Sequence, residues 1–486
     1  MPEVPEYLMK FPDRVSENLN HKTIFVTGGT GFLGKILIEK ILRKSTKLER
    51  MFLLVRSKKG KEPKQRLDEM FAAPIFEILR NKCGPEVFDK VTAINGDMSE
   101  KGMGMSEEDR KLVRGCVQVV FHSAATIRFD EPLRKAVLLN TRGTREVLEL
   151  AKGMEKLELF LHVSTAYCHL QEKVLEEKSY PPADNPHKVI KFCELLDEEI
   201  IDSVSKKILK DFPNSYAFTK NLSEGLVVEQ MNNGMPCLIA RPSVVIPVWL
   251  EPLPGWTDNI NGPTGLLIGA GKGVIRTMYC DNTGYADYAP VDLAVNAILL
   301  AAWNYMSVKY VESNIFNLTT SADMKVTWQD VVDTGKDISL NEIPLNNVVW
   351  YPGGSMKRSK LLHQICVIFL HLIPALILDG IIYLSGNKPV LLRIQDRITK
   401  GFEVFEYYAN NQWEFKNDNI KELRRIMNQR EAIEYKIDGM GMDIRNYFRD
   451  CILAARLYIL KEMPETIPAA RRHLRMYVQL HFITYF

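Results

Sequence analysis

The chain has 486 residues, of which 46% are hydrophobic, and this length favours two or three structural units over one compact core. Its 63 Lys and Arg residues nearly balance its 60 Asp and Glu residues, which leaves a net charge of +3. Because nucleic-acid-binding proteins normally carry a strong positive field, this balance argues against a nucleic-acid partner.

The eight cysteines are scattered singly, and neither they nor the histidines show the spacing of a zinc site. We therefore expect free thiols in a reducing compartment and no bound metal. The first residues, MPEVPEYLMKFPDR, contain acids and prolines where a signal peptide needs an apolar core, so residues 1–20 are interpreted as an N-terminal extension.

Short, largely apolar β-branched runs alternate with helical patterns through the first half of the chain. This alternation predicts an α/β fold, a Rossmann-type doubly wound parallel sheet whose strands are covered on both faces. The expected strands are residues 23–28, 50–56, 90–97, 118–124, 159–165 and 236–243.

The first expected strand runs into a glycine-rich turn, TGGTGFLG, and then directly into a helical pattern. Gly28 and Gly31 allow close approach of a pyrophosphate to backbone N–H groups at the helix N-terminus, and Gly34 lets the helix lie close to the strand. The glycines fall three residues apart, a spacing that resembles the extended short-chain dehydrogenase/reductases. The predicted cofactor loop also includes Thr30, Phe32 and Leu33.

The second expected strand ends in LLVRSKKGK, at the position where an NAD-dependent enzyme would carry an acidic residue. Arg56 and Lys58 offer charged donors to a 2′-phosphate, which favours NADPH. A solvated basic loop is the alternative, and it suits Lys59 and Lys61 better than Arg56.

Two further cofactor contacts follow from position at strand ends. Asp97 closes the third expected strand and is placed to accept a hydrogen bond from the adenine amino group. Ser123 and Ala124 follow the fourth strand and are expected beside the cofactor.

Tyr216 and Lys220 lie four residues apart in NSYAFTKN, so a helix would place both on one face. The ammonium group and the ribose hydroxyls would lower the phenol's pKa, and Tyr216 could then protonate an oxyanion as hydride arrives. A partner hydroxyl is expected at the end of the fifth strand, from Thr165, with Ser164 as the alternative.

After Ser243 the pattern loosens into Pro and Gly turns, which are typical of a substrate lobe, and residues 21–345 are assigned to the cofactor-binding domain with this lobe. The loop GLLIGAGKG resembles a phosphate-binding loop, but Lys272 is followed by Gly273 in place of Ser or Thr. A loop of the substrate lobe is the better interpretation.

From residue 355 to residue 486 the pattern predicts a second, all-helical domain. Within it, residues 364–384 are apolar on all sides and long enough to cross a bilayer. His371, Pro374 and Asp379 argue against a simple spanning helix. A buried core helix, an interfacial segment and a membrane-inserted segment are all compatible with this pattern.

Taken together, these motifs resemble the animal-type, alcohol-forming fatty acyl-CoA reductases. The motifs that carry the resemblance extend over nearly the whole chain: TGGTGFLG, LLVR, HVSTAYC, SYAFTK, RPSVV, GPTGLLIGAGKGVIRTM, YAPVDLAVNAILLAAW, HLIPALILDGIIYLSGNKP and ARLYILKE. One departure is KIDGMGMDIRNYFRD, which has no Trp ahead of Tyr447.

The resemblance implies reduction of a long-chain or very-long-chain fatty acyl-CoA to the primary alcohol with two NADPH and release of CoA. It also implies that Pro242 lies near the nicotinamide, and that the product is a precursor of waxes or ether lipids. We expect membrane association, with the catalytic domain facing the cytosol at the endoplasmic reticulum or the peroxisome. The alternatives are an extended reductase acting on a sugar nucleotide or steroid, and a non-catalytic scaffold that binds NADPH or lipid.

Overall fold

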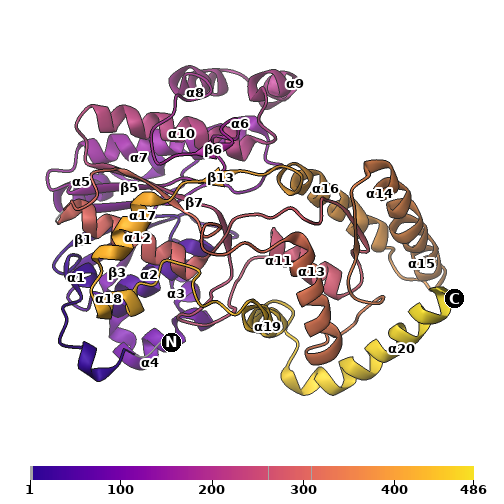
Figure 1. Ribbon diagram of the computed structural model, residues 1–486. Helices are drawn as coiled ribbons and strands as arrows, with labels where there is room; N and C mark the ends of the chain where they lie inside the picture. Colours follow the sequence, from indigo (N-terminus) through magenta and orange to yellow (C-terminus); the bar gives the residue numbers. More distant parts are fainter. Residues whose placement is uncertain (1–3, 261, 308, 486) are drawn as a thin grey trace.

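Seven parallel strands form the central sheet of the computed structural model, which describes residues 4–260, 262–307 and 309–485, the last six by their backbone alone (Figure 1). The strand order is β11-β7-β5-β4-β1-β2-β3, with every pair parallel. The strands are β1 (Thr23–Thr27), β2 (Arg50–Val55), β3 (Val91–Asn95), β4 (Val119–His122), β5 (Leu159–Val163), β7 (Cys237–Pro242) and β11 (Ile315–Leu318). This confirms the predicted doubly wound fold and its six strands, and adds β11 at one edge.

Helices cover both faces of the sheet, as the continuous apolar strands require. One face packs against α1 (Arg14–Glu17), α2 (Phe32–Lys44), α3 (Pro63–Phe71), α4 (Glu77–Cys83) and α12 (Val291–Met306). The other packs against α5 (Glu107–Cys116), α6 (Leu133–Ala136), α7 (Gly143–Lys152), α8 (Pro186–Leu195), α9 (Glu198–Leu209) and α10 (Ser215–Asn232).

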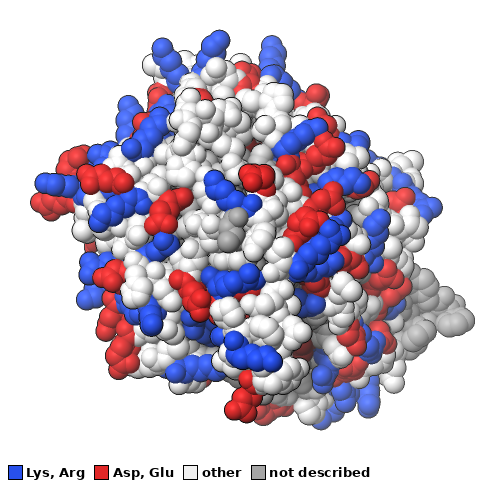
Figure 2. Space-filling model, turned by 60° about the vertical axis from the view of Figure 1, so that its left-hand side comes forward, with Lys and Arg blue, Asp and Glu red and all other residues white. Residues whose placement is uncertain are grey.

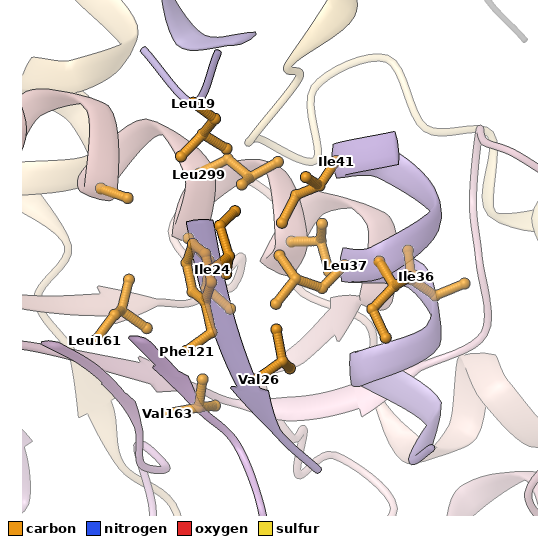
Figure 3. Packing of buried hydrophobic residues seen from close by; sticks show 14 of the residues in the cluster. Leu19, Ile24, Val26, Ile36, Leu37, Ile41, Phe121, Leu161, Val163 and Leu299 are labelled. Atoms are coloured by element: carbon orange, nitrogen blue, oxygen red, sulfur yellow. The ribbon is translucent and has the colours of Figure 1, made fainter. Parts of the chain in front are cut away.

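The core on the α2 face is built from apolar side chains of β1, β4 and β5 and of the helices α2 and α12 (Figure 3). Ile24 and Val26 of β1 point toward Leu37 and Ile41 of α2, and Leu299 of α12 closes the layer. Burial of these side chains holds α2 against β1, which fixes the position of the glycine-rich turn between them.

The segment assigned to a substrate lobe contains α11 (Pro263–Gly271), α13 (Trp328–Asp337) and short parallel strand pairs. These pairs are β8 (Val244–Ile246) with β10 (Tyr288–Pro290), and β9 (Thr277–Tyr279) with β12 (Ser355–Lys357). The loop that resembled a phosphate-binding loop is the helix α11, and Lys272 after it pairs with Glu462 at 2.8 Å.

The C-terminal region is largely helical and contains α14 (Lys360–Val367), α15 (Ile373–Leu384), α16 (Leu391–Ala409), α17 (Asp418–Ile426), α18 (Gln429–Glu434), α19 (Ile444–Ala454) and α20 (Ile467–Tyr485). A π-helical turn joins α14 to α15, so that residues 360–384 form one helical run of 25 residues. Only 17% of its most apolar window is buried. A buried core helix, one of the three sequence-based alternatives for this segment, is therefore wrong.

The C-terminal region returns to the first half of the chain after α16. Strand β13 (Glu414–Phe415) pairs with β6 (Val174–Leu175), and α17 packs on α12 (Figure 1). Glu431 of α18 binds the guanidinium of Arg14 at 2.6 Å. On the face drawn in Figure 2, Lys and Arg side chains are interspersed with Asp and Glu, and that face carries no field of one sign.

Candidate active site

The sequence-predicted site residues lie at the carboxyl ends of the parallel strands, which meet at one edge of the sheet. Gly28 follows β1, Arg56 follows β2, Asp97 follows β3, Ser123 follows β4, and Ser164 with Thr165 follow β5. Pro242 is the last residue of β7. In open α/β sheets this edge is where ligands bind.

The glycine-rich turn is held by backbone contacts that exclude side chains. Gly28 has φ +77°, and a Cβ there would lie 2.6 Å from the Ala124 nitrogen. A Cβ on Gly34 would lie 2.3 Å from the Gly28 oxygen. Gly31 instead caps α2 and has only the Gly28 oxygen within 4 Å of an added Cβ, at 3.2 Å.

The turn therefore leaves open space at the N-terminus of α2. The first backbone N–H groups of a helix, here those of Phe32 and Leu33, have no partner within the helix and carry the positive end of its dipole. Thr30 precedes them in the turn. These features fit the pyrophosphate of a nicotinamide dinucleotide.

Arg56 and Asp97 are brought together by the pairing of β2 with β3. The Arg56 Nη1 lies 3.3 Å from a carboxylate oxygen of Asp97, and the Arg56 side chain is 47% exposed. Burial alone would raise the pKa of Asp97, but bonds from Ser99 and Arg56 lower it. The two predicted adenosine contacts thus form one exposed ion pair, while Lys58 lies in the exposed turn that follows.

Arg66 of α3 is a second cation beside Arg56 that sequence reasoning missed. Its guanidinium donates to the Arg56 carbonyl oxygen at 2.6 Å. Burial and the positive charge of Arg56 lower its pKa, which reflects two like charges close together. Arg66 lies ten residues after Arg56 in the sequence, on the far side of a turn, so no local pattern predicted that the two would be close.

The loop after β4 packs against the glycine-rich turn. The Ser123 hydroxyl donates to the Thr27 carbonyl at 2.9 Å, and the Ala124 N–H points at the Thr27 hydroxyl at 3.4 Å. Asn140 holds the far end of this loop by accepting from the Thr126 N–H at 2.8 Å and donating to Thr219 of α10 at 2.9 Å. Asn140 therefore joins the cofactor side of the site to the helix that carries Tyr216.

Tyr216 and Lys220 lie on one face of α10, near its N-terminus. Asn214 caps the helix by accepting from the Ala217 N–H at 2.9 Å. The Lys220 ammonium group donates to the Val163 carbonyl at the end of β5, at 2.7 Å. This bond fixes α10 against the strand that supplies Thr165.

The protonation states suit a proton donor beside a cation. Burial and the nearby Cys168 raise the pKa of Tyr216, and a hydrogen bond with Thr165 opposes this shift. The sequence-based expectation is a lowered pKa for this phenol. In the protein alone the pKa of Tyr216 is raised instead, because burial outweighs the lowering effect of Thr165. Burial lowers the pKa of Lys220 to about 8.

Of the two candidate hydroxyls, that of Thr165 lies near enough to the phenol to oppose the rise in the pKa of Tyr216. The Ser164 hydroxyl points instead toward the Cys168 sulfur, at 3.7 Å. This geometry favours Thr165, the first choice from the sequence, as the partner of the phenol.

An aromatic wall, made by Phe129 from the loop after β4 and Tyr408 from the C-terminal region, borders Tyr216. The ring of Phe129 lies 5.5 Å from Tyr216 and 5.6 Å from Tyr408, which is near the end of α16. The Tyr408 hydroxyl also accepts from the side chain of the cap Asn214 at 2.9 Å. Sequence reasoning missed Phe129 and Tyr408, since neither belongs to a motif and they lie far apart in the chain.

Behind Lys220, α10 carries Glu224 into a fully buried charge cluster. Arg241 donates to both Glu224 carboxylate oxygens, at 2.9 and 2.8 Å, and His169 contacts one of them at 2.9 Å. Burial would lower the pKa of His169, but Cys168 and Glu224 raise it to about 10. Cys168, His169 and Glu224 offer ligand atoms within 4.8 Å of one another, although the chain spacing had suggested no such group.

Comparisons with known proteins agree with the fold and identify the family. Two family models, both described as male sterility protein, match the chain: an NAD-binding model over residues 26–298 and a model named Sterile over residues 370–462. Among solved structures, a reductase domain of a nonribosomal peptide synthetase from Mycobacterium tuberculosis has a TM-score of 0.60 at 17% identity, covering 94% of this chain and 98% of its own. The terminal reductase domain of a myxalamid pathway has a TM-score of 0.57 at 16% identity, covering 91% and 92%.

Curated relatives are similar over almost the full chain. Fatty acyl-CoA reductase 1 of Rattus norvegicus is 38% identical over 461 residues, which cover 95% of this chain and 89% of the relative. Fatty acyl-CoA reductase wat of Drosophila melanogaster is 36% identical over 463 residues, with the same two coverages. The human fatty acyl-CoA reductase 1 is 35% identical over 461 residues, again covering 95% and 89%.

Proposed function

The chain belongs to the fatty acyl-CoA reductases, a family of oxidoreductases with a nicotinamide cofactor, and from this premise we propose that it uses two NADPH to reduce a long-chain or very-long-chain fatty acyl-CoA to the primary alcohol and free CoA. The observation that carries the proposal is the placement of Tyr216, Lys220 and Thr165. Thr165 follows β5, Tyr216 and Lys220 lie on α10, and the Lys220 ammonium group is bound to the end of β5, at the carboxyl edge of the sheet where ligands bind in such folds.

The residues proposed to hold the cofactor follow the strand ends. The turn from Gly28 to Gly34 takes the pyrophosphate, Arg56 with Lys58 takes the 2′-phosphate, and Asp97 takes the adenine amino group. Ser123, Ala124 and Pro242 line the nicotinamide side. Arg66 adds a second positive charge next to Arg56, which supports the choice of NADPH over NADH.

When bound, NADPH supplies one hydride to the thioester carbonyl carbon and, after exchange, a second hydride to the aldehyde carbon. In each reduction, Tyr216 gives its phenolic proton to the carbonyl oxygen as negative charge develops there. Thr165 donates a hydrogen bond to the same oxygen, and the Lys220 ammonium group stabilises the phenolate that remains.

Between the two reductions, the hemithioacetal loses its hydroxyl proton and expels CoA as the thiolate, which is then protonated. This collapse gives the aldehyde. The aromatic wall of Phe129 and Tyr408 shields the reacting carbon from water at this stage.

The proposed cellular site is a membrane surface, because the acyl chain is insoluble in water while CoA is anionic. The catalytic domain faces the cytosol, and the endoplasmic reticulum and the peroxisome are the two candidate membranes. The exposed apolar helix formed by residues 360–384 supports this part of the proposal.

The decisive experiment measures fatty alcohol and NADPH oxidation when the purified protein is incubated with palmitoyl-CoA or longer acyl-CoA. We expect Tyr216→Phe and Lys220→Met each to lower kcat at least 100-fold, the usual scale for loss of acid catalysis. Tyr7→Phe and Lys206→Met, both on the exposed surface, are the matched controls and should keep full activity. No oxidation of NADPH with any long or very long acyl-CoA would refute the proposal.

Cofactor choice is tested separately by Arg56→Asp. This variant should raise KM for NADPH at least tenfold and shift the preference toward NADH, because a carboxylate repels the 2′-phosphate. Lys59→Ala in the same turn is the control. An unchanged preference for NADPH would contradict the role given to Arg56.

A further inference from the structure

The helical run of residues 360–384 presents a long apolar face to the outside of the molecule. Its exposed side chains include Phe369 at 64%, Leu376 at 61% and Leu384 at 86% exposure. In Figure 1, α14 and α15 lie at the end of the molecule away from the central sheet. We define the exposed apolar face by Leu361, Ile365, Phe369, Leu376, Ile381 and Leu384.

The opposite face of the same helical run is fixed to the protein along its length. The His371 ring accepts from the Arg276 N–H at 3.0 Å, and the His363 ring contacts the Thr277 hydroxyl at 3.2 Å. Both histidines are buried against β9 and its neighbours. His371, which argued against a simple spanning helix, thus faces protein.

Asp379 completes this attachment at the other end. Its carboxylate accepts from the N–H groups of Val390, Leu391 and Leu392, at 2.9 to 3.0 Å, and so caps the N-terminus of α16. The carboxylate is satisfied without water, and it ties α15 to α16 as a helical hairpin.

The course of α16 decides how this hairpin meets a membrane. The helix packs along α15 and exposes Arg393, Asp396, Arg397 and Lys400. A helix of 25 residues is about 37 Å long, enough to cross a bilayer, but a crossing would draw these four charged residues into hydrocarbon. An orientation in the plane of the leaflet leaves them at the level of the lipid headgroups.

Charge on the hairpin favours a lipid surface that carries anions. From Lys360 to the end of α16 the segment contains five basic residues, which are Lys360, Lys388, Arg393, Arg397 and Lys400, against Asp379, Asp396, Glu403 and Glu406. Lys360 pairs with Glu406 and Lys400 with Asp396, which leaves three basic residues near the turn between α15 and α16 without an ion pair among the described residues. Asp379 is already bound by the α16 cap. Basic side chains beside an apolar helix are the pattern of interfacial membrane helices.

We propose that the exposed apolar face lies in the outer part of one leaflet of an anionic phospholipid bilayer, in the membrane plane, and that the α15–α16 hairpin does not cross the bilayer. The inference rests on the proposed function in one respect, since it takes the substrate to be a lipid. In this proposal the protein has one membrane-docking surface. The central sheet and the active site then lie on the headgroup side of the leaflet.

Docking is tested by flotation of the purified full chain with vesicles of phosphatidylcholine and phosphatidylserine. The double variant Phe369→Asp with Leu376→Asp should bind vesicles at least tenfold more weakly, whereas Leu195→Asp, an equally exposed leucine on α8, should bind as the parent does. Binding should also weaken with salt and without phosphatidylserine. A parent chain that does not float, or a double variant that floats unchanged, overturns the proposal.

The mode of insertion is tested with Asn387→Cys, in the turn between α15 and α16. In sealed membranes from expressing cells, an impermeant maleimide added to the cytosolic side should modify this variant at one more site than the parent, with the exposed Cys83 as the internal standard. Protection of the new thiol until detergent is added would show a spanning hairpin and overturn the proposal.

Two readouts separate lipid docking from a defect in catalysis and from self-association. Reduction of the soluble substrate octanoyl-CoA should be equal in the parent and the double variant. Failure of the parent to reduce any long or very long acyl-CoA, with flotation intact, would refute the proposed function and leave docking standing. Sedimentation without lipid tests a second copy of the chain as the occupant. A parent dimer that the double variant abolishes, together with unchanged flotation, overturns lipid docking.

Discussion

Lys220 is a buried cation whose charge changes within the physiological range. Burial lowers its pKa to about 8, more than two units below that of a free lysine. The ammonium form, which the proposed mechanism requires, is therefore present below pH 8 and is lost as pH rises through that value.

We predict that kcat/KM for acyl-CoA falls above pH 8, with a slope of one proton. Initial rates measured between pH 6 and 10 at saturating NADPH would show this limb. A limb near pH 10, or none, would mean that Lys220 is not the titrating group that matters.

Glu224 and Arg241 form a buried ion pair behind Lys220 of α10, with side chains 3% and 0% exposed. Glu224→Gln leaves the cations of Arg241 and His169 without their counter-charge, at a cost of roughly 3–5 kcal/mol in unfolding free energy. Asp184→Asn, at the exposed pair with Lys210, should cost about 0–1 kcal/mol.

Urea denaturation of both variants measures the contrast. The double variant Glu224→Gln with Arg241→Met should recover part of the loss, because it removes a buried charge together with its partner. Equal stability of Glu224→Gln and the parent would show that this cluster does not stabilise the fold.

At single residues, the sequence predicted groups that belong to short motifs. Tyr216, Lys220 and Thr165 were found because helical spacing and strand ends place them by local rules. Phe129 and Tyr408 were not found, because their meeting depends on how α16 packs against the sheet, which no local pattern encodes. The sites remain predictions until the variants are measured.

Among the elements, the turn from β1 to α2 contains glycines with two different roles. Gly34 is required by the packing of the fold, whereas Gly31 leaves space for a ligand. A methyl group on Gly34 would meet the Gly28 oxygen at 2.3 Å, whereas one on Gly31 meets that oxygen at 3.2 Å and nothing else within 4 Å. The two substitutions should therefore fail in different ways.

Gly34→Ala should lower the unfolding free energy by roughly 1–3 kcal/mol, the scale of overpacking. Gly31→Ala should change stability little and weaken NADPH binding at least tenfold, by occupying the space in front of the helix N-terminus. Thermal unfolding and NADPH fluorescence titration distinguish the two. Normal NADPH binding by Gly31→Ala would contradict the assigned pyrophosphate site.

Helices and strands with a regular hydrophobic pattern could be predicted from the sequence. The elements that were missed or left open have physical causes. The strands of the Rossmann core are apolar because both faces are covered, and this signal is strong. Strand β11 was missed, because it lies after Ser243, where the regular alternation of strands and helices has loosened. For residues 360–384 composition indicated an apolar helix, but only the contacts of His371 and Asp379 show which face is attached and which is exposed.

At the scale of the whole molecule, the C-terminal region packs against and pairs with the first half of the chain. Glu177 illustrates this, since its carboxylate accepts from the N–H of Asn317 in β11 at 2.9 Å and from that of Asn419 in α17 at 2.7 Å. Together with the β6–β13 pair and the Arg14–Glu431 contact, it joins segments more than 100 residues apart.

We predict that residues 1–354 and 355–486, expressed separately, do not fold, since each would expose core surface that the other covers. The intact chain should unfold in one cooperative transition, measured by circular dichroism and by limited proteolysis during heating. Two separate transitions would instead support independent folding of the assigned units 21–345 and 355–486. The sequence showed the change of character near residue 355 but not the return of β13 and α17, because long-range pairing leaves no local trace.

One helix, α16, begins at the hairpin and ends at the aromatic wall. Its 19 residues span about 28 Å, from the Asp379 cap to Tyr408, whose ring lies with that of Phe129 beside Tyr216, the proposed proton donor. The proposed docking predicts that an acyl chain following this helix exchanges with lipid and not with bulk water. The rate should then obey surface dilution: at fixed amounts of enzyme and palmitoyl-CoA, added inert phospholipid slows turnover, while turnover of octanoyl-CoA stays constant. For this protein the effective substrate concentration is a mole fraction in a two-dimensional phase.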